Sequence, residues 1–212
     1  MEKSKKLKIF LGLFYLVVVS SFLYFLLSKF TLEEISSYEF IKNNRDYFFD
    51  LKRSNLYFLS VVFLFLSILW IVMAGFAVPL ALLIGFIFGK WLGTFILVLG
   101  MSFGATFLYI FGNYFLKEIV KEKFLKKFKT LEVKFKKAEF NYLLVYRFIG
   151  GIPFSLSCVL PCIFNVKISN FFWATMIGII PQIFLMVSIG SGLEKVIQQN
   201  LDAPKILDII YS

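Results

Sequence analysis

The segment YRFIGGIPFSLSCVLPCIFN, residues 146–165, combines properties that ordinary segments keep apart. It is apolar enough to enter a lipid bilayer, yet it contains Arg147, Pro153, Pro161, Gly150 and Gly151. Proline and glycine interrupt helices, and non-helical backbone at membrane depth is tolerated only where protein or a water-filled cavity satisfies its polar groups. The segment therefore predicts a broken, re-entrant element in a membrane.

The composition of the whole chain is that of a membrane protein. Of its 212 residues, 59% are hydrophobic and 17% are charged, whereas soluble domains are nearer half apolar and a quarter charged. The excess of 23 Lys and Arg over 13 Asp and Glu fits cytoplasmic loops that lie against anionic lipid. We therefore expect membrane lipids as partners and no nucleic acid.

Metal and enzyme chemistry are not predicted. The chain has no histidine, which removes the commonest metal ligand and the usual acid–base at neutral pH. Cys158 and Cys162 lie four residues apart in an apolar segment without further ligands, a pattern more typical of small apolar side chains on one helical face than of a metal site. We expect no metal, no cofactor, no catalytic residue and no enzyme activity.

The apolar runs divide the chain into a membrane domain and polar ends. We expect a basic start and transmembrane helix at 1–28, a polar extracytoplasmic loop at 29–55, a membrane domain at 56–195 and a polar tail at 196–212. Runs of about 20 apolar residues span a bilayer, so 56–74 and 94–116 are predicted spans, and 169–190 is a span kinked by Pro181 with Gly178 nearby. Residues 117–140 read either as a basic amphipathic helix on the membrane surface or as a solvated cytoplasmic loop.

The sidedness of these elements stays open. If 75–89 enters and returns, three crossings separate the amino terminus from 117–140. Both are rich in lysine, and the positive-inside rule places both in the cytoplasm. Either 75–89 effectively crosses, or one lysine cluster lies on the outer side.

The opening segment, extended to 142–166, has a counterpart earlier in the sequence at 75–93. GFAVPLALLIGFIFGKW and GGIPFSLSCVLPCIFNVK both place a glycine before a proline (Pro79, Pro153), then an apolar run, a Phe with a turn former, and a lysine. Gly85, Gly89 and Gly93 share one helical face, which predicts close helix packing. Paired interrupted segments in two halves of a chain indicate a transporter-like binding site.

Arg147 is the candidate ligand-binding residue, because it is the only charged residue between Glu139 and Lys167. Helix amino termini and a planar guanidinium both favour an anion such as phosphate. The alternative is an interfacial anchor whose side chain reaches the headgroups.

Arg147, Pro153-Phe154 and the run FFWATMIGIIP at 171–181 resemble the DedA/VTT-domain superfamily, also called SNARE-associated Golgi proteins, and in particular its bacterial branch related to the yeast Golgi Tvp membrane proteins. The resemblance covers about 70–195. It implies two facing re-entrant hairpins flanked by transmembrane helices, and movement of lipids between leaflets, with polyisoprenyl phosphates as cargo in bacteria. It also matches Arg147, Pro153 and Phe154 to the second-hairpin motif.

The resemblance further matches Thr175, Gly178 and Pro181 to the helix after that hairpin, and it implies a further transmembrane helix beyond the end of this chain, so the tail is expected to be truncated relative to relatives. Residues 56–116 contain no Asp or Glu, unlike relatives that carry acids in the first hairpin region.

The predicted fold is an all-α integral membrane protein, a multi-pass helical bundle with two facing re-entrant hairpins in an inverted-repeat, transporter-like arrangement. The predicted function is movement of lipids or lipid-phosphates between leaflets of a bacterial plasma membrane, as a scramblase or flippase. The expected headgroup site comprises Arg147, Gly150, Gly151, Pro153 and Phe154. The alternatives are an ion-coupled transporter of a small solute and a non-catalytic membrane assembly or scaffold protein. The oligomeric state is not predicted, and each alternative is compatible with a homo-oligomer.

Overall fold

The computed structural model describes residues 55–73, 76–120, 136–151 and 153–198, together with positions 12, 14, 15, 17, 20, 21, 24 and 50. Regular structure in this part of the chain is helical throughout: α5 (Leu56–Val72), α6 (Ala77–Val120), α8 (Glu139–Ile149), α9 (Phe154–Val159), η2 (Leu160–Phe164), α10 (Ile168–Gly178) and α11 (Ile180–Gln198). Most of the predicted first span and polar loop, residues 121–135 of the basic segment, and the tail beyond 198 lie outside the described residues.

Helix α6 is the long central element, and it is broken at Gly89. The backbone of Gly89 has φ 76° and ψ 176°, a conformation that is essentially open to glycine alone. The helix resumes directly and runs on to Val120. The predicted segment 75–93 therefore contains the end of one helical arm, a glycine break and the start of a second arm.

Length and composition identify the elements suited to a bilayer. Ala77–Phe115 is apolar enough and long enough to cross a membrane. Ile168–Gly178 and Ile180–Gly192 pass the same test as a pair, bent by 43° at the break between them. The shorter α5 and the α9–η2 segment are apolar but below spanning length, so the helix at the predicted span 56–74 is shorter than expected. Among the described residues, one or two elements therefore have the length of a membrane span.

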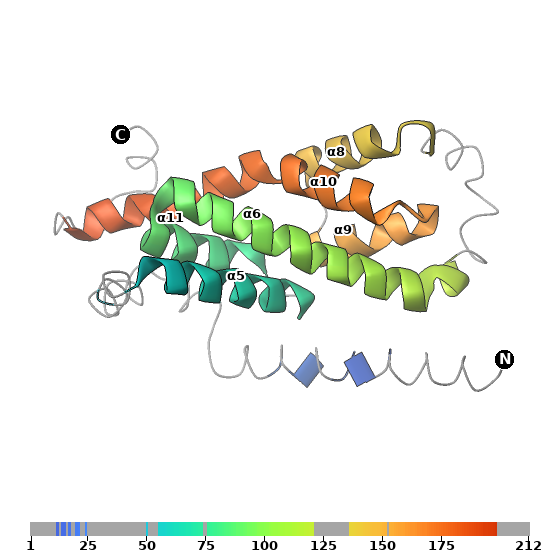
Figure 1. Cartoon of the computed structure of the whole chain (residues 1–212), viewed down its shortest axis with the longest axis horizontal. Coiled ribbons are helices and arrows are strands. Elements are labelled where there is room, and N and C mark those ends of the chain that lie inside the picture. The colour runs from blue at the N-terminus through green and yellow to red at the C-terminus, as the bar shows by residue number, and fades with distance from the viewer. Residues whose placement is uncertain are drawn as a thin grey trace.

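Two helical hairpins flank the long arm of α6. Figure 1 shows α5 and the first arm of α6 entering from one end of the molecule, and α8 and α9 entering from the other. Ser67 of α5 lies against Gly100 of α6, whereas Val159 at the end of α9 lies against Gly112. The first hairpin consists of α5 and the first arm of α6 and turns between Val72 and Ala77, so it begins before the expected hairpin 75–93. The second turns between Ile149 and Phe154, inside the expected hairpin 142–166.

Both short apolar arms end in a residue with positive φ. Gly89 closes the first arm with φ 76°, and Asn165 closes the second with φ 47°. A lysine follows each of them, Lys90 and Lys167, and both lysines are exposed. The two segments thus share a backbone feature as well as a sequence pattern.

Helices α6 and α11 pack with their backbones in contact. A Cβ atom built on Gly85 would lie 2.1 Å from the carbonyl oxygen of Val187, and one on Gly190 would lie 2.2 Å from that of Leu82. Gly93 faces Val187 as well, with 3.0 Å to its Cγ1. Pro79 lies in the first turn of α6, where its missing N–H removes no helical hydrogen bond. Gly85, Gly93 and Gly190 allow the close approach that apolar helices use in lipid, whereas Gly89, expected on the same packing face, breaks the helix and has no atom within 4 Å of an added Cβ.

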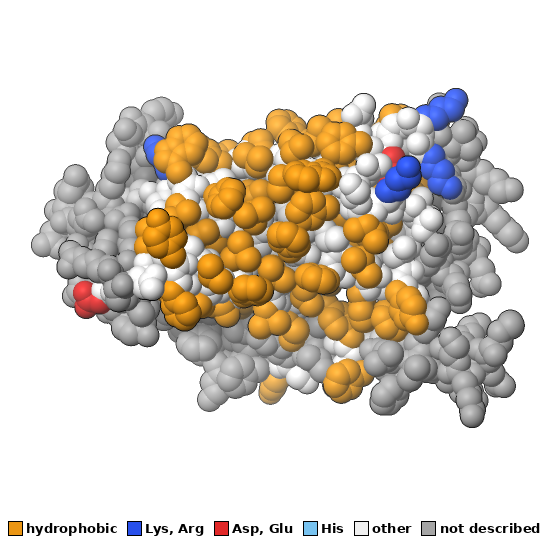
Figure 2. All heavy atoms as spheres, in the orientation of Figure 1, with side chains coloured by type: hydrophobic (Ala, Val, Ile, Leu, Met, Phe, Trp, Pro, Cys, Tyr) orange, Lys and Arg blue, Asp and Glu red, His pale blue; other side chains and the backbone are white. Residues whose placement is uncertain are grey.

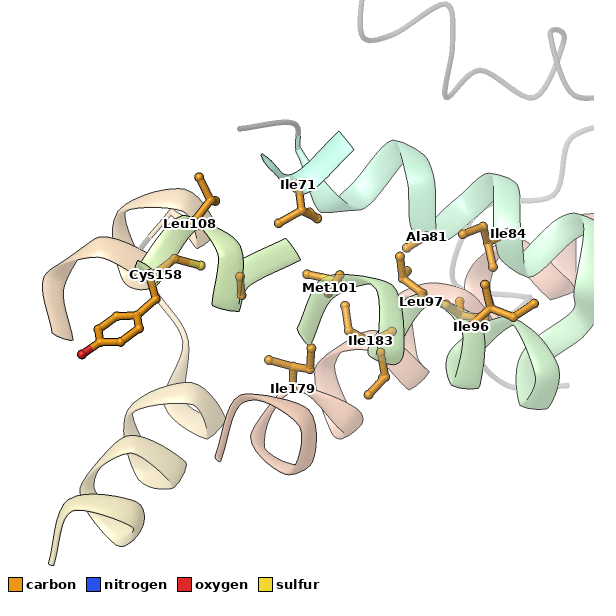
Figure 3. Close-up of a cluster of buried hydrophobic side chains, with 14 of the residues drawn as sticks. Ile71, Ala81, Ile84, Ile96, Leu97, Met101, Leu108, Cys158, Ile179 and Ile183 are labelled. Atoms are coloured by element: carbon orange, nitrogen blue, oxygen red, sulfur yellow. The ribbon is translucent and has the colours of Figure 1, made fainter. Parts of the chain in front are cut away.

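The core lies where α5, α6 and the α10–α11 pair meet. Figure 3 shows Ile179 and Ile183 pointing towards Leu97 and Met101 of α6, and all four side chains are buried. The outside is also apolar: Figure 2 shows hydrophobic side chains across the middle of one face, with basic side chains towards its ends. A surface of this kind belongs to a protein that lies in lipid.

Candidate functional site

Arg147 lies in the last turn of α8 and is 4% exposed. It is the one charged side chain that is buried in the described part of the chain. The lysines with a described side chain are all exposed: Lys90, Lys136, Lys137 and Lys167. A buried charge is costly unless its polar groups are satisfied, so its partners decide what the site can do.

The guanidinium group of Arg147 is held by neutral acceptors. Its Nε donates to Oγ1 of Thr175 at 3.1 Å, Nη1 donates to Oγ of Ser157, and Nη2 donates to Sγ of Cys158 at 3.5 Å. Ser157 in turn donates to the carbonyl oxygen of Phe154 at 2.6 Å. No carboxylate among the described residues forms an ion pair with Arg147, so its charge has no counter-ion there.

Two aromatic rings enclose the same group. The Cζ atom of Arg147 lies 5.1 Å from the ring centroid of Phe154 and 5.1 Å from that of Phe171. Ring faces attract a cation within about 6 Å. The rings stabilise the charge without using any of its N–H donors.

The turn that follows Arg147 depends on both glycines of the predicted site. Gly150 has φ 67° and Gly151 has φ 83°, values that favour glycine. Pro153 then precedes the first turn of α9, where its carbonyl oxygen accepts from the N–H of Ser157 at 2.9 Å. The turn thereby reverses the chain and brings α9 back beside the arginine.

Gln182 of α11 fixes this turn from the other side. Its Nε2 donates to the carbonyl oxygens of Arg147 at 3.2 Å and Phe148 at 2.9 Å. Carbonyl oxygens in the last turn of a helix have no helical N–H partner, so Gln182 takes that role. A Cβ atom on Gly150 would lie 2.7 Å from that nitrogen. Gln182 therefore couples the end of α8 to α11.

The predicted residues of the following helix lie in α10 and at the start of α11. Thr175 is buried and accepts from Arg147, and a Cβ atom on Gly178 would lie 2.6 Å from Cβ of Arg147. Pro181 lies in the first turn of α11, just after the 43° bend. The structure thus brings Arg147, Phe154 and Thr175 into contact and gives Gly178 and Pro181 supporting positions.

A small cavity opens beside the arginine. Its volume is about 40 Å³, and Tyr146, Arg147, Gly150, Phe154, Ser157, Ile179 and Gln182 line it. A guanidinium group has five N–H donors, and three of them have the acceptors described above, which leaves two. A cavity of this volume has room for a few water molecules. The arrangement offers spare donors on an uncompensated cation, the chemistry of an anion site.

Sequence reasoning missed three members of this site. Ser157 and Cys158 hold the guanidinium, and Gln182 holds the turn. Gln182 had a signal, since it is a polar side chain directly after Pro181 in an apolar run. Ser157 and Cys158 had none, because their role depends on the direction of the reversed chain.

A second polar cluster lies at the far end of α8. One carboxylate oxygen of Glu139 accepts from the backbone N–H of Lys167 at 2.7 Å and from Nδ2 of Asn170 at 3.0 Å. Nearby, the buried hydroxyl of Tyr109 donates to the carbonyl oxygen of Val166 at 2.6 Å. These bonds tie α8 and α6 to the start of α10. Across the described residues, no group of three or more His, Cys, Asp or Glu could hold a metal ion.

The chain is similar to proteins of one known family. The sequence profile described as the VTT domain matches residues 76–192. A protein described as transmembrane protein 41 homolog, from Caenorhabditis elegans, is 26% identical over 143 residues, which are 64% of this chain and 58% of that protein. The matched part is thus less than two thirds of the relative. No solved structure matches the chain.

Proposed function

Because this chain belongs to the VTT-domain family, we propose that this membrane protein moves lipids or lipid-phosphates between leaflets, in the plasma membrane of a bacterium. Arg147 receives the anionic headgroup. The anionic lipids include polyisoprenyl phosphates, which the family resemblance suggests as cargo.

The arrangement of the helices supports a path through the bilayer. Figure 1 shows the two hairpins entering from opposite ends of the molecule. We take them as re-entrant elements of an inverted repeat that enter from opposite leaflets, with their turns near mid-depth. Non-helical backbone there requires protein or water to satisfy it, and Gln182 does so at the second turn. The turn at Gly150 and Gly151 is then where a headgroup meets polar groups inside lipid.

The single observation that carries the proposal is the state of Arg147. A side chain that only anchors a helix to the interface places its charge in water, whereas Arg147 is 4% exposed. Its neutral partners leave its charge uncompensated within the described residues and use three of its five N–H donors, and Arg147 lines a small cavity. A phosphate oxygen supplies both the missing charge and the missing acceptors.

The cavity volume of about 40 Å³ sets a condition on this function. It admits water, but a headgroup needs Phe154 or Gln182 to move aside. Gln182 connects the turn to α11 by two hydrogen bonds, so opening on that side requires α8 and α11 to separate locally. Headgroup passage is therefore coupled either to a movement of the Phe154 side chain or to that local separation.

Leaflet exchange of a fluorescent phospholipid tests the proposal. The full chain is reconstituted into vesicles, and the fraction of label open to an external quencher is followed with time. We expect the wild type to speed the exchange and Arg147→Ala to slow it. Lys167→Ala, which removes an exposed lysine, serves as the control. Exchange equal to that of protein-free vesicles would defeat the proposal.

A further inference from the structure

A larger and almost wholly apolar cavity lies between α8 and η2. Its volume is about 370 Å³, within the range of small-molecule sites. Tyr142, Leu143 and Tyr146 line it from one side, and Leu160, Ile163 and Phe164 line it from the other. No part of the proposed headgroup chemistry uses this space.

Tyr146 is a common wall of this apolar cavity and the small cavity at Arg147. Its hydroxyl is buried and has no hydrogen-bond partner in the described structure. A buried polar atom without a partner costs about 1–3 kcal/mol, so a native structure that keeps one needs an explanation. The orphan hydroxyl lies on a residue whose ring centroid is 6.0 Å from Cζ of Arg147.

Together these features describe two halves of one ligand. One half is anionic, because Arg147 has a buried charge, spare donors and no carboxylate partner among the described residues. The other half is hydrocarbon, because the larger cavity offers almost only apolar side chains. The ring of Tyr146 separates them, and its hydroxyl is a donor without an acceptor.

We propose that the cavity between α8 and η2 holds the first part of the hydrocarbon chain of a lipid whose phosphate lies at Arg147, and that the hydroxyl of Tyr146 donates to that phosphate. The inference rests on the proposed function and names the ligand as an amphiphile bound by chain and headgroup at once. It also assigns Tyr146 as a ligand-positioning residue. The shape of the hydrocarbon chain near the headgroup then determines which lipid the protein binds.

The test uses hexadecyl phosphate with a photoreactive diazirine in its alkyl chain. The full-length protein is reconstituted in zwitterionic vesicles with this probe and illuminated, and the labelled peptides are quantified by mass spectrometry. We expect labelling concentrated on residues 142–164, competed by unlabelled hexadecyl phosphate and not by inorganic phosphate at the same concentration. If inorganic phosphate reduces the labelling as strongly as unlabelled hexadecyl phosphate does, the site binds the anion without binding the hydrocarbon chain, and the inference is overturned.

Two variants probe the two parts of the site. Ile163→Trp fills the apolar cavity and should lower the labelling of residues 142–164 at least severalfold. Leu156→Trp is the matched control, because Leu156 is 58% exposed on the same hairpin and lines neither cavity. Tyr146→Phe keeps the ring and removes only the hydroxyl, so it folds even if the larger change does not. Tyr146→Phe should raise the concentration of hexadecyl phosphate that halves the labelling about 10-fold or more.

The outcomes separate this inference from the proposed function. Labelling spread evenly over the lipid-facing helices, or left unchanged by both Ile163→Trp and Tyr146→Phe, overturns the chain site. If Arg147→Ala still slows leaflet exchange in that case, the proposed function stands without it. If Arg147→Ala leaves exchange unchanged while labelling stays specific, the protein binds the amphiphile without moving it.

Discussion

Replacing Thr175 with valine removes the oxygen that accepts from Nε of Arg147 and keeps the shape of the side chain. Thr175 is 1% exposed and does not line the small cavity at Arg147, so we expect no water to replace the lost bond of 3.1 Å. A hydrogen bond to a charged group contributes about 1.5–3 kcal/mol, and a buried donor left without a partner costs a similar amount. We expect Thr175→Val to destabilise the protein by about 2 kcal/mol.

The measurement is the thermal midpoint of the purified protein in detergent, with a matched control. For a chain of this length, 1 kcal/mol corresponds to about 2–4 °C, so Thr175→Val should lower the midpoint by about 4–8 °C. Thr106→Val is the control. Its hydroxyl donates to the carbonyl oxygen of Ser102 within the same helix at 2.7 Å, and that carbonyl keeps its helical partner, so the expected change is below about 0.5 kcal/mol.

A double-mutant cycle makes the test specific to the pair. If the cost of Thr175→Val arises from the stranded guanidinium N–H, it disappears in an Arg147→Met background, where no such donor exists. Equal losses in both backgrounds would refute the reasoning, since the effect would then come from the packing of α10 alone. Equal midpoints for Thr175→Val and Thr106→Val would refute it as well.

Three further changes test other parts of the structure by the same thermal midpoint. Gly89→Ala should cost about 1–3 kcal/mol through backbone strain alone, because no atom lies within 4 Å of the added Cβ; an unchanged midpoint would contradict the break in α6. Tyr109→Phe should cost about 1 kcal/mol by stranding the carbonyl oxygen of Val166, and a neutral result would show that this carbonyl finds another donor. Glu139→Gln keeps the acceptor for Lys167 N–H and should be nearly neutral, whereas Glu139→Leu should cost about 1 kcal/mol; equal midpoints of the two variants would contradict the role of this hydrogen bond.

The apolar helices and their interruptions were predictable from local sequence. Helix breakers act through the backbone of their own residue, so an interruption near Gly150 and Gly151 was predictable, whereas which glycines adopt positive φ was not: Gly85 and Gly93 stay helical, and Gly89 between them has φ 76°. The similarity of the two short arms was visible for the same reason, in Phe88-Gly89 and Phe164-Asn165. The bacterial branch of the family and the sidedness of the helices stay predictions.

The partners of Arg147 were predictable only in part. The family resemblance selected Arg147, Phe154 and Thr175 separately, and the structure adds their contact. Ser157 and Cys158 reach the guanidinium because the chain reverses at the glycine pair and α9 returns beside α8. Contacts of this kind depend on the direction of a turn, which residue spacing does not encode. The position of the first turn, between Val72 and Ala77, has the same origin.

The central claim is that a buried, uncompensated Arg147 moves anionic lipid through the protein. The measurement that tests it most directly is leaflet exchange of a fluorescent lipid phosphate in vesicles containing the wild type or Arg147→Lys. Lysine keeps the charge and loses the planar fork of donors, so it should exchange the lipid more slowly than the wild type and faster than Arg147→Ala. Wild-type exchange rates in both variants would contradict the account.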